Sequence, residues 1–294
     1  MTRVAMIGIG AMGEPMAANL LKKGFALSVL RHRRSEPAER LRALGATLAA
    51  SAAEAASGCE IAVLCLPTSR EVEQVVTGRN GIAQAAAPGA LVIDCSTSEP
   101  ASTRRLAALF AERGIDLIDA GMTRGVQGAR QGKLAFFLGG ERAAVDRAMP
   151  VLEALGDTFV HLGPVGHGHT AKIVSNVLSY GTVALVNEAL MLGTRGGVDG
   201  AKLFEALMQG APSKALESFG PRMLAGDYDP ARVSVDHVCE DMLMAQELAR
   251  DACAPVYLLA VAQQLYRQFS LRGDGERDMS AIAELWRAAP PPKR

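Results

Sequence analysis

The chain has no excess charge of either sign, because 31 lysines and arginines balance 31 aspartates and glutamates. Proteins that bind nucleic acid through its phosphates usually carry a basic excess, which is lacking here. The proportions of hydrophobic residues (49%) and charged residues (21%) are those of an ordinary globular protein. We therefore expect no nucleic-acid partner. A chain of 294 residues has room for about two domains.

Paired cysteines and metal-ligand clusters are also lacking. The five cysteines are odd in number and show no metal-type spacing, and the histidines lack such spacing with cysteines or acids. We interpret His167 and His169, which flank a glycine, as part of a solvated turn. The pattern predicts no metal site, and cysteines used in this way suit a reducing cytoplasm. The sequence opens directly on a strand pattern, so we expect no signal peptide and a cytoplasmic protein.

No apolar stretch of membrane-spanning length is free of costly polar residues. The nearest candidate, residues 173–192, contains Asn176, Asn187 and Glu188, which are expensive in a bilayer. We interpret it as a long buried helix and expect no membrane partner. A single small domain cannot easily cover so apolar a helix, so the pattern favours packing against a second subunit.

The sequence does contain a glycine pattern at its start. Gly8, Gly10 and Gly13 fit G-x-G-x-x-G, between an apolar run at Val4–Gly8 and helical spacing over Met12–Gly24. In this context the first glycine permits a tight turn, the second admits a pyrophosphate, and the third lets the helix pack on the strand. The free amides of the helix then attract the phosphates. The alternative is a plain strand–turn–helix unit.

The identity of the nucleotide is indicated by the residues after the second expected strand, Ala26–Leu30. A dinucleotide-binding unit normally places an acid there, about 20 residues after the glycines, to bind the ribose 2′-hydroxyl. Here the sequence is Arg31, His32, Arg33, Arg34. Arginine can pair with a 2′-phosphate, so we expect NADP to be preferred and NAD to remain possible. A solvated basic turn is the alternative.

Strand and helix patterns alternate through the first half of the chain, which predicts a doubly wound parallel sheet of the Rossmann type. The expected strands are Val4–Gly8, Ala26–Leu30, Glu60–Pro67, Ala90–Cys95, Asp116–Ala120, Leu134–Gly140 and Thr158–Gly163. The second half reads as helices at about Thr170–Arg195, Gly200–Gln209, Ser234–Arg250 and Pro255–Leu271. We expect a nucleotide-binding domain over residues 1–163 and an all-α domain over residues 164–294, joined by a long interdomain helix.

The first of these helices carries the candidate chemistry. Lys172 and Asn176 lie one turn apart and share a face that is otherwise apolar. Burial disfavours the charged form of a lysine, and such a lysine can accept or donate a proton near neutral pH. The alternative is a surface lysine, which the dipole at a helix N-terminus disfavours. No competing catalytic set is present, and hydride transfer with a lysine acid/base needs none.

These motifs, in this order, resemble those of the β-hydroxyacid dehydrogenase family, which includes 3-hydroxyisobutyrate dehydrogenase and tartronate semialdehyde reductase. The matching stretches are GIGAMGEPMAANL, LCLPTSREV, IDCSTSEP, DAGMTRGVQGARQGKLAFFLGG, GHGHTAKIVSN and DMSAI. The resemblance implies hydride exchange between NADP(H) and a small anionic substrate, a β-hydroxy acid or its semialdehyde. It also implies an all-helical second domain like that of 6-phosphogluconate dehydrogenase, and homodimers or homotetramers built around the long helix.

The resemblance also assigns residues. Lys172 is implied as the acid/base. The implied substrate ligands are Thr123, Arg124, Gly125 and Asn176. The implied cofactor contacts are Gly8, Gly10, Ala11, Met12, Gly13, Leu66, Pro67 and Thr97, to which the spacing argument adds Arg31, His32 and Arg33.

Two positions depart from the family pattern. Arg124 stands where a glycine is usual, and its guanidinium can form a bidentate contact with a carboxylate or sulfonate. The alternative is an Arg124 that faces solvent. Glu240–Asp241 stands where the family usually has Lys-Asp. Two other functions fit the same fold, imine reduction and non-catalytic cofactor binding, but relatives of both kinds usually lack the lysine found at Lys172.

Overall fold

The computed structural model of the protein describes residues 2–31 and 35–287. The chain divides into two compact units, Met1–Lys172 and Ile173–Arg294. The division falls inside helix α9 (His167–Arg195), which begins in the first unit and continues as a helix of the second. The division predicted after residue 163 lies in the loop just before this helix and stays a prediction.

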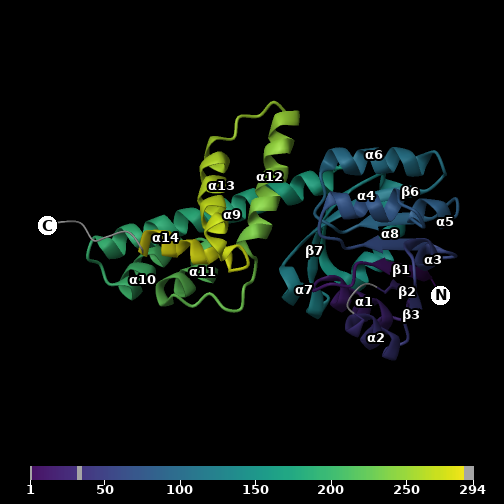
Figure 1. The fold of residues 1–294 in the computed structure, drawn as a ribbon, viewed down its shortest axis with the longest axis horizontal. Coiled ribbons are helices and arrows are strands. Elements are labelled where there is room, and N and C mark those ends of the chain that lie inside the picture. The colour runs from purple at the N-terminus through teal and green to yellow at the C-terminus, as the bar shows by residue number, and fades with distance from the viewer. Residues whose placement is uncertain (1, 32–34, 288–294) are drawn as a thin grey trace. The chain divides into compact units, whose positions relative to one another are not determined.

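The first unit is built on one eight-stranded sheet with the order β3-β2-β1-β4-β5-β6-β7-β8 (Figure 1). Its strands are β1 (Arg3–Ile7), β2 (Ala26–Leu30), β3 (Thr47–Ala49), β4 (Ile61–Leu64), β5 (Leu91–Asp94), β6 (Asp116–Thr123), β7 (Leu134–Gly139) and β8 (Gly156–His161). Strands β4 and β5 are buried along their whole length, which explains their continuous apolar sequences. The predicted Rossmann-type sheet is confirmed.

Two features of the sheet differ from the prediction. The short edge strand β3 was not expected, because three residues give too brief a pattern to read. Strands β6 and β7 pair antiparallel, whereas the other neighbouring pairs are parallel. Only the seven-residue helix α7 (Gly125–Gln131) with its short flanks connects β6 to β7. A parallel crossover needs a dozen or more residues, so the connection is too short to allow one.

Helices cover both faces of the sheet. They are α1 (Gly13–Lys22), α2 (Glu36–Ala43), α3 (Ala52–Ala56), α4 (Ser69–Thr77), α5 (Ile82–Ala85), α6 (Pro100–Ala111) and α8 (Arg142–Leu155). Alternate residues of β1 point to opposite faces. Val4 and Met6 join a core with α1 and α8, while Ala5 and Ile7 join a second core with α3 to α6. The two cores hold the sheet between them, and with it the carboxyl ends of the strands, where the loops discussed below begin.

The second unit is all helical within its described residues (Figure 1). After α9 come α10 (Gly200–Gly210), α11 (Lys214–Ala225), α12 (Val235–Asp251), α13 (Tyr257–Phe269), a short irregular turn η1 (Ser270–Asp274), the 3-10 helix η2 (Met279–Ala283) and α14 (Glu284–Arg287). Helix α11 was not expected, since Gly220 and Pro221 interrupt its pattern, although the rest of the unit confirms the all-α prediction. Tyr180, Val183 and Leu190 of α9 lie at the centre of its core.

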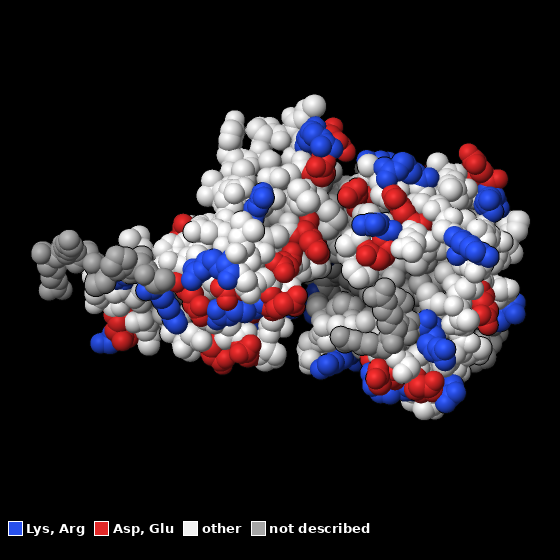
Figure 2. Space-filling model, viewed as in Figure 1, with Lys and Arg blue, Asp and Glu red and all other residues white. Residues whose placement is uncertain are grey.

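Helix α9 is the one described helix long and apolar enough to cross a membrane by length and composition. Within a single chain this helix is only partly buried, because one side of it is exposed, and its expected packing against a second subunit stays a prediction. Val174, Leu178, Leu185 and Leu192 are 56%, 72%, 64% and 77% exposed. Their spacing of four and seven residues places them in one stripe along the helix. On the face drawn in Figure 2, cationic and anionic side chains are interspersed.

Candidate active site

The glycine loop between β1 and α1 has the geometry of a phosphate cradle. A Cβ atom on Gly8, where φ is +95°, would lie 2.1 Å from the carbonyl oxygen of Cys65, and one on Gly13 would lie 1.8 Å from that of Gly8. Nothing lies within 4 Å of the Cβ position at Gly10. Gly8 and Gly13 are thus needed for packing, whereas the bare backbone of Gly10 faces open space. This arrangement fits an NAD(P) pyrophosphate.

The start of α1 adds to this fit. Its N-cap residue, Met12, makes no side-chain cap. In the first turn the amide of Glu14 donates to the carbonyl of Gly10 at 3.0 Å and Pro15 has no amide proton, so an anion at this helix start would bind the amides that precede Glu14. Glu14 lies in the same turn, and its carboxylate forms two hydrogen bonds with Arg40, of 2.6 and 2.9 Å. The hydrogen bond from Arg40 lowers the pKa of Glu14. The ion pair offsets part of the repulsion that this carboxylate would exert on a phosphate.

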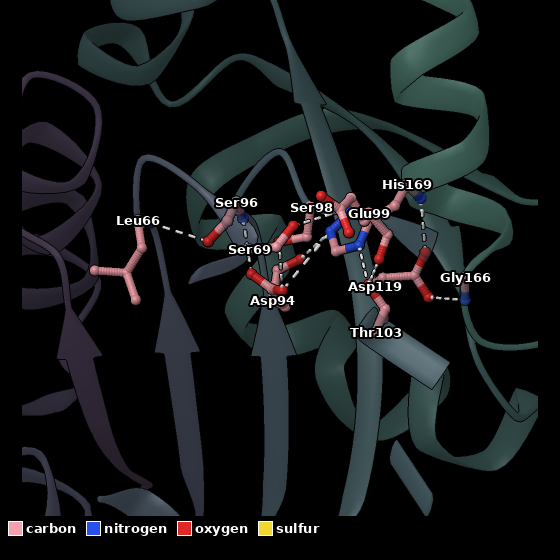
Figure 3. A network of polar contacts seen from close by, with 10 residues as sticks. All are labelled: Leu66, Ser69, Asp94, Ser96, Ser98, Glu99, Thr103, Asp119, Gly166 and His169. Carbon is pink, nitrogen blue, oxygen red and sulfur yellow. Dashed lines mark hydrogen bonds and ion pairs between the residues drawn. The ribbon is translucent and has the colours of Figure 1, made fainter. Parts of the chain in front are cut away.

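The loops after β4 and β5 are joined to each other by side-chain hydrogen bonds (Figure 3). The amide of Leu66 donates to Ser96 Oγ at 2.9 Å, and the amide of Glu99 donates to Ser69 Oγ at 2.8 Å. Pro67 and Thr97 lie in these two loops. In a doubly wound sheet ligands bind beyond the carboxyl ends of the strands, where the order reverses. Strands β1, β4 and β5 are neighbours there, so the predicted cofactor contacts of this unit share one sheet edge.

The remaining predicted cofactor contacts follow β2. The amide of Arg31 donates to the carbonyl of Ala49 at 3.0 Å, and the residue is exposed at the end of the strand. His32 and Arg33 lie outside the described residues.

Cys65 and Cys95 lie near the same loops, at the ends of adjacent strands. Burial raises the pKa of the Cys65 thiol to about 12 and that of Cys95 well above its ordinary value. Neither thiol is a nucleophile at neutral pH, because the thiolate is the reactive form. The part of the chain that the structure describes also holds no group of three or more His, Cys, Asp or Glu side chains suited to a metal ion.

Buried polar groups hold the N-terminus of α9, so the solvated turn predicted for His167 and His169 is wrong for His169. His167 is exposed, as a solvated turn requires, but His169 is fully buried. The carboxylate of Asp119, at 0% exposure, accepts hydrogen bonds of 2.7 Å from the amides of Gly166 and His169. These bonds satisfy amides that a helix start leaves unpaired, so α9 begins at His167, ahead of the expected Thr170.

Lys172 follows one turn later and is half-buried. A Cβ atom on Gly121 of β6 would lie 2.6 Å from the Cβ of Lys172. Only glycine therefore lets α9 lie this close to the strand. Thr123 is two residues further along β6 and on the same face as Gly121, because side chains alternate along a strand. The first unit thus brings the predicted acid/base and a predicted substrate ligand to one face of β6.

Arg124 is engaged within its own unit. It has a left-handed backbone, with φ of 77°, at the start of α7. Its guanidinium donates to the carbonyl of Lys133 at 2.8 Å, to the carboxylate of Asp157 at 2.5 Å and to the hydroxyl of Thr158 at 2.8 Å. The hydrogen bond from Arg124 lowers the pKa of Asp157. Gly125, next in sequence, also has a positive φ, of 58°. Arg124, which is predicted to bind a substrate anion, is thus already hydrogen-bonded to two residues of β8.

In the second unit, Asn176 is bound to a buried acid that sequence reasoning did not single out as its partner. Asp241 of α12, at 1% exposure, accepts hydrogen bonds of 2.6 Å from Asn176 Nδ2 and from the hydroxyl of Tyr180. Burial, followed by the charge of Asp241, raises the pKa of Tyr180. His237 Nε2 lies 3.5 Å from the same carboxylate oxygen, and Glu240 is exposed. Asp241 thereby fixes the amide plane of Asn176.

Residues 3–163 match the NAD binding domain of 6-phosphogluconate dehydrogenase, and residues 166–286 match the NAD-binding domain of NADP-dependent 3-hydroxyisobutyrate dehydrogenase. The chain is 35% identical to an NAD-dependent L-serine dehydrogenase of Pseudomonas aeruginosa, over 97% of this chain and 98% of that protein. It is 33% identical to a 3-sulfolactaldehyde reductase of Escherichia coli, over 98% and 97%.

Among solved structures, 3-hydroxyisobutyrate dehydrogenase of Mycobacterium tuberculosis, described with L-serine, is similar with a TM-score of 0.90 and 28% identity. The match covers 98% of this chain and 100% of that one. The matches to each half of the chain and to its full length therefore indicate the same family as the sequence motifs do. The chain belongs to the β-hydroxyacid dehydrogenase family, whose members are NAD(P)-dependent enzymes acting on the hydroxyl group of small hydroxy acids.

Proposed function

We propose that this protein transfers a hydride between NADP(H) and a small β-hydroxy acid or its semialdehyde, with Lys172 moving the proton. The observation that carries the proposal is the close packing of Lys172 on Gly121, at the sheet edge that also holds the glycine loop. The free cysteines fit a reducing compartment, and we place the enzyme in the cytoplasm.

The proposed chemistry divides between cofactor and chain. When bound, the nicotinamide accepts or gives the hydride at the carbon that bears the hydroxyl group. In oxidation Lys172 takes the hydroxyl proton, and in reduction it returns this proton to the oxygen. Thr123, Gly125 and Asn176 are proposed to hold the substrate, and Asp241 keeps the amide of Asn176 in one orientation.

A panel of small hydroxy acids and aldehydes, assayed with NADP and NAD, tests this assignment. We expect turnover of β-hydroxy acids and their semialdehydes, and of aldehydes that carry a carboxylate or sulfonate. Reduction of imines in place of hydroxy-acid turnover, or cofactor binding without any turnover, would contradict the proposal.

The proposed preference for NADP rests on Arg31 and on the missing acid after β2. Arg31→Asp should lower kcat/KM with NADP and raise it with NAD, because a carboxylate repels a 2′-phosphate and accepts from a 2′-hydroxyl. Arg3→Asp, at an exposed position on the opposite end of the sheet, is the control. Equal kcat/KM for both cofactors in the unmodified enzyme would contradict the proposed preference.

The proposed role of Arg124 in binding the substrate anion requires its guanidinium to leave Asp157. A charge-assisted contact in a partly dry pocket contributes about 1.5–3 kcal/mol. Arg124→Gly should then lower kcat/KM by about 10- to 150-fold. Asp157→Asn removes the carboxylate that competes for Arg124. The KM for the substrate should therefore stay the same or fall.

These two variants separate a substrate ligand from a structural residue. If Arg124 only braces β8, Arg124→Gly and Asp157→Asn should lower the melting temperature together and leave kcat/KM near that of the unmodified enzyme. The anion would then be held by Thr123, Asn176 and backbone amides.

The exposed stripe of α9 supports a homodimer or homotetramer. Apolar residues repeated along one exposed helix face, at spacings of four and seven, match the seam along which helices pair. Leu185→Asp should shift the mass measured by light scattering towards that of a monomer. Leu44→Asp, on the first unit at 61% exposure, is the matched control and should leave the mass unchanged. A stable monomer of the unmodified chain at micromolar concentration would contradict the proposal.

A further inference from the structure

His169 is bonded at both ring nitrogens inside the first unit (Figure 3). Its Nδ1 lies 2.8 Å from the hydroxyl of Thr103 on α6, and its Nε2 lies 3.2 Å from the carbonyl oxygen of Asp94 at the end of β5. All three side chains are at most 1% exposed. A buried histidine satisfied on both sides by other elements is a rigid link between them.

The donors and acceptors can be assigned from chemistry. A carbonyl oxygen only accepts, so His169 Nε2 carries the proton and donates to Asp94. In a neutral ring Nδ1 is then the acceptor, and the Thr103 hydroxyl, which also lies 3.1 Å from the carbonyl oxygen of Glu99, donates to it. This arrangement leaves no ring nitrogen unpaired. A residue at position 169 without a donor or without an acceptor would leave the carbonyl of Asp94 or the hydroxyl of Thr103 without this hydrogen bond.

The same link reaches the two loops predicted to contact the cofactor. The carboxylate of Asp94 accepts from the amide of Ser96 and the hydroxyl of Ser98, at 3.0 and 3.1 Å. Ser96 in turn accepts from the amide of Leu66. A chain of hydrogen bonds therefore runs from the loop after β4, through the loop after β5, to the first turn of α9.

We propose that His169 is a positioning residue, which ties the first turn of α9 to the cofactor loops and so fixes where Lys172 stands. Lys172 lies one turn after His169 on the same helix and is packed on Gly121. Asp119 anchors the helix start through its amides, and His169 sets its rotation through a side chain. A displacement of about 1 Å in a reacting group can cost about 100-fold in rate. The inference rests on the proposed role of Lys172.

The test compares His169→Ala and His169→Gln with His167→Ala, a change of the same residue type in an exposed position two residues earlier. We expect His169→Ala to lower kcat about 10- to 100-fold per cofactor-binding site, with cofactor stoichiometry and KM little changed. Glutamine offers an NH2 donor group and a carbonyl acceptor, so His169→Gln should recover part of the loss. His167→Ala should match the unmodified enzyme.

A merely structural role gives a different result. Partial unfolding lowers the number of cofactor sites and leaves kcat per site unchanged, and that outcome would overturn the proposal. Thr103→Val, which keeps the shape but removes the donor to Nδ1, provides a second variant if His169→Ala fails to fold. We expect it to lower kcat per site in the same way, and full activity in this variant would overturn the proposal.

Hydrogen exchange gives a readout that does not depend on turnover. In the unmodified enzyme and in His167→Ala, NADP should slow exchange of the amides of residues 166–172, because the loops and the helix start are linked. In His169→Ala this protection should be lost while NADP still binds. Protection that persists would overturn the link. An unmodified enzyme without turnover on any hydroxy acid would contradict the proposed function instead, and the exchange result would still decide the link.

Discussion

Lys172→Ala should lower kcat by roughly 10²–10⁴-fold and leave the cofactor Kd unchanged. Alanine keeps the Cβ atom that contacts Gly121, so the packing of α9 on β6 should survive while the amine is lost. Two other titratable side chains of the first unit are not suited to replace it. His169 is bonded at both nitrogens, and the Cys65 thiol, with its pKa raised to about 12, stays protonated.

The measurement is steady-state kinetics beside cofactor titration. Lys202→Ala, an exposed lysine of α10, is the matched control and should keep full activity. A Lys172→Ala enzyme with near-native kcat would show that another group moves the proton.

Gly10→Ala should weaken cofactor binding at least about tenfold, which corresponds to about 1.4 kcal/mol. The added methyl group meets no protein atom within 4 Å, so the fold should be unaffected. It would instead occupy the space through which a pyrophosphate approaches the backbone. The loss should appear in the Kd for both NADP and NAD, because they share the pyrophosphate.

The control for this variant is Gly210→Ala in α10, where a Cβ atom also meets nothing within 4 Å. It should change neither Kd nor melting temperature by more than a small amount. Gly13→Ala should behave differently and destabilise the first unit, since its Cβ would overlap the carbonyl of Gly8. A Gly10→Ala enzyme with unchanged Kd would mean that the loop only makes a turn.

The features predicted well from sequence are those set by local pattern. Buried strands such as β4 and β5 have continuous apolar sequences, and the glycine loop is recognisable because strand and helix flank it directly. The features that were missed depend on distant partners. His169 resembles a turn residue because Thr103 and Asp94, which bury and bond it, lie 66 and 75 positions away.

Arg124 illustrates the same limit from the opposite side. Its place in a substrate segment favours an anion ligand, but Asp157, 33 positions away, supplies a competing carboxylate. The partnership of Asn176 with Asp241, 65 positions away, was likewise not readable from the helix pattern alone. The sequence names candidate residues, while only the fold shows which side chains hold them in place.

Direct hydride transfer is the central claim, and isotope tracing tests it most directly. The best substrate of the panel is prepared with deuterium at the carbon that bears the hydroxyl group and is oxidised with NADP. Mass spectrometry of the reduced cofactor should find the deuterium on its nicotinamide ring, because the hydride passes between the two molecules without exchange. Deuterium released to water, with none in the reduced cofactor, would contradict the claim.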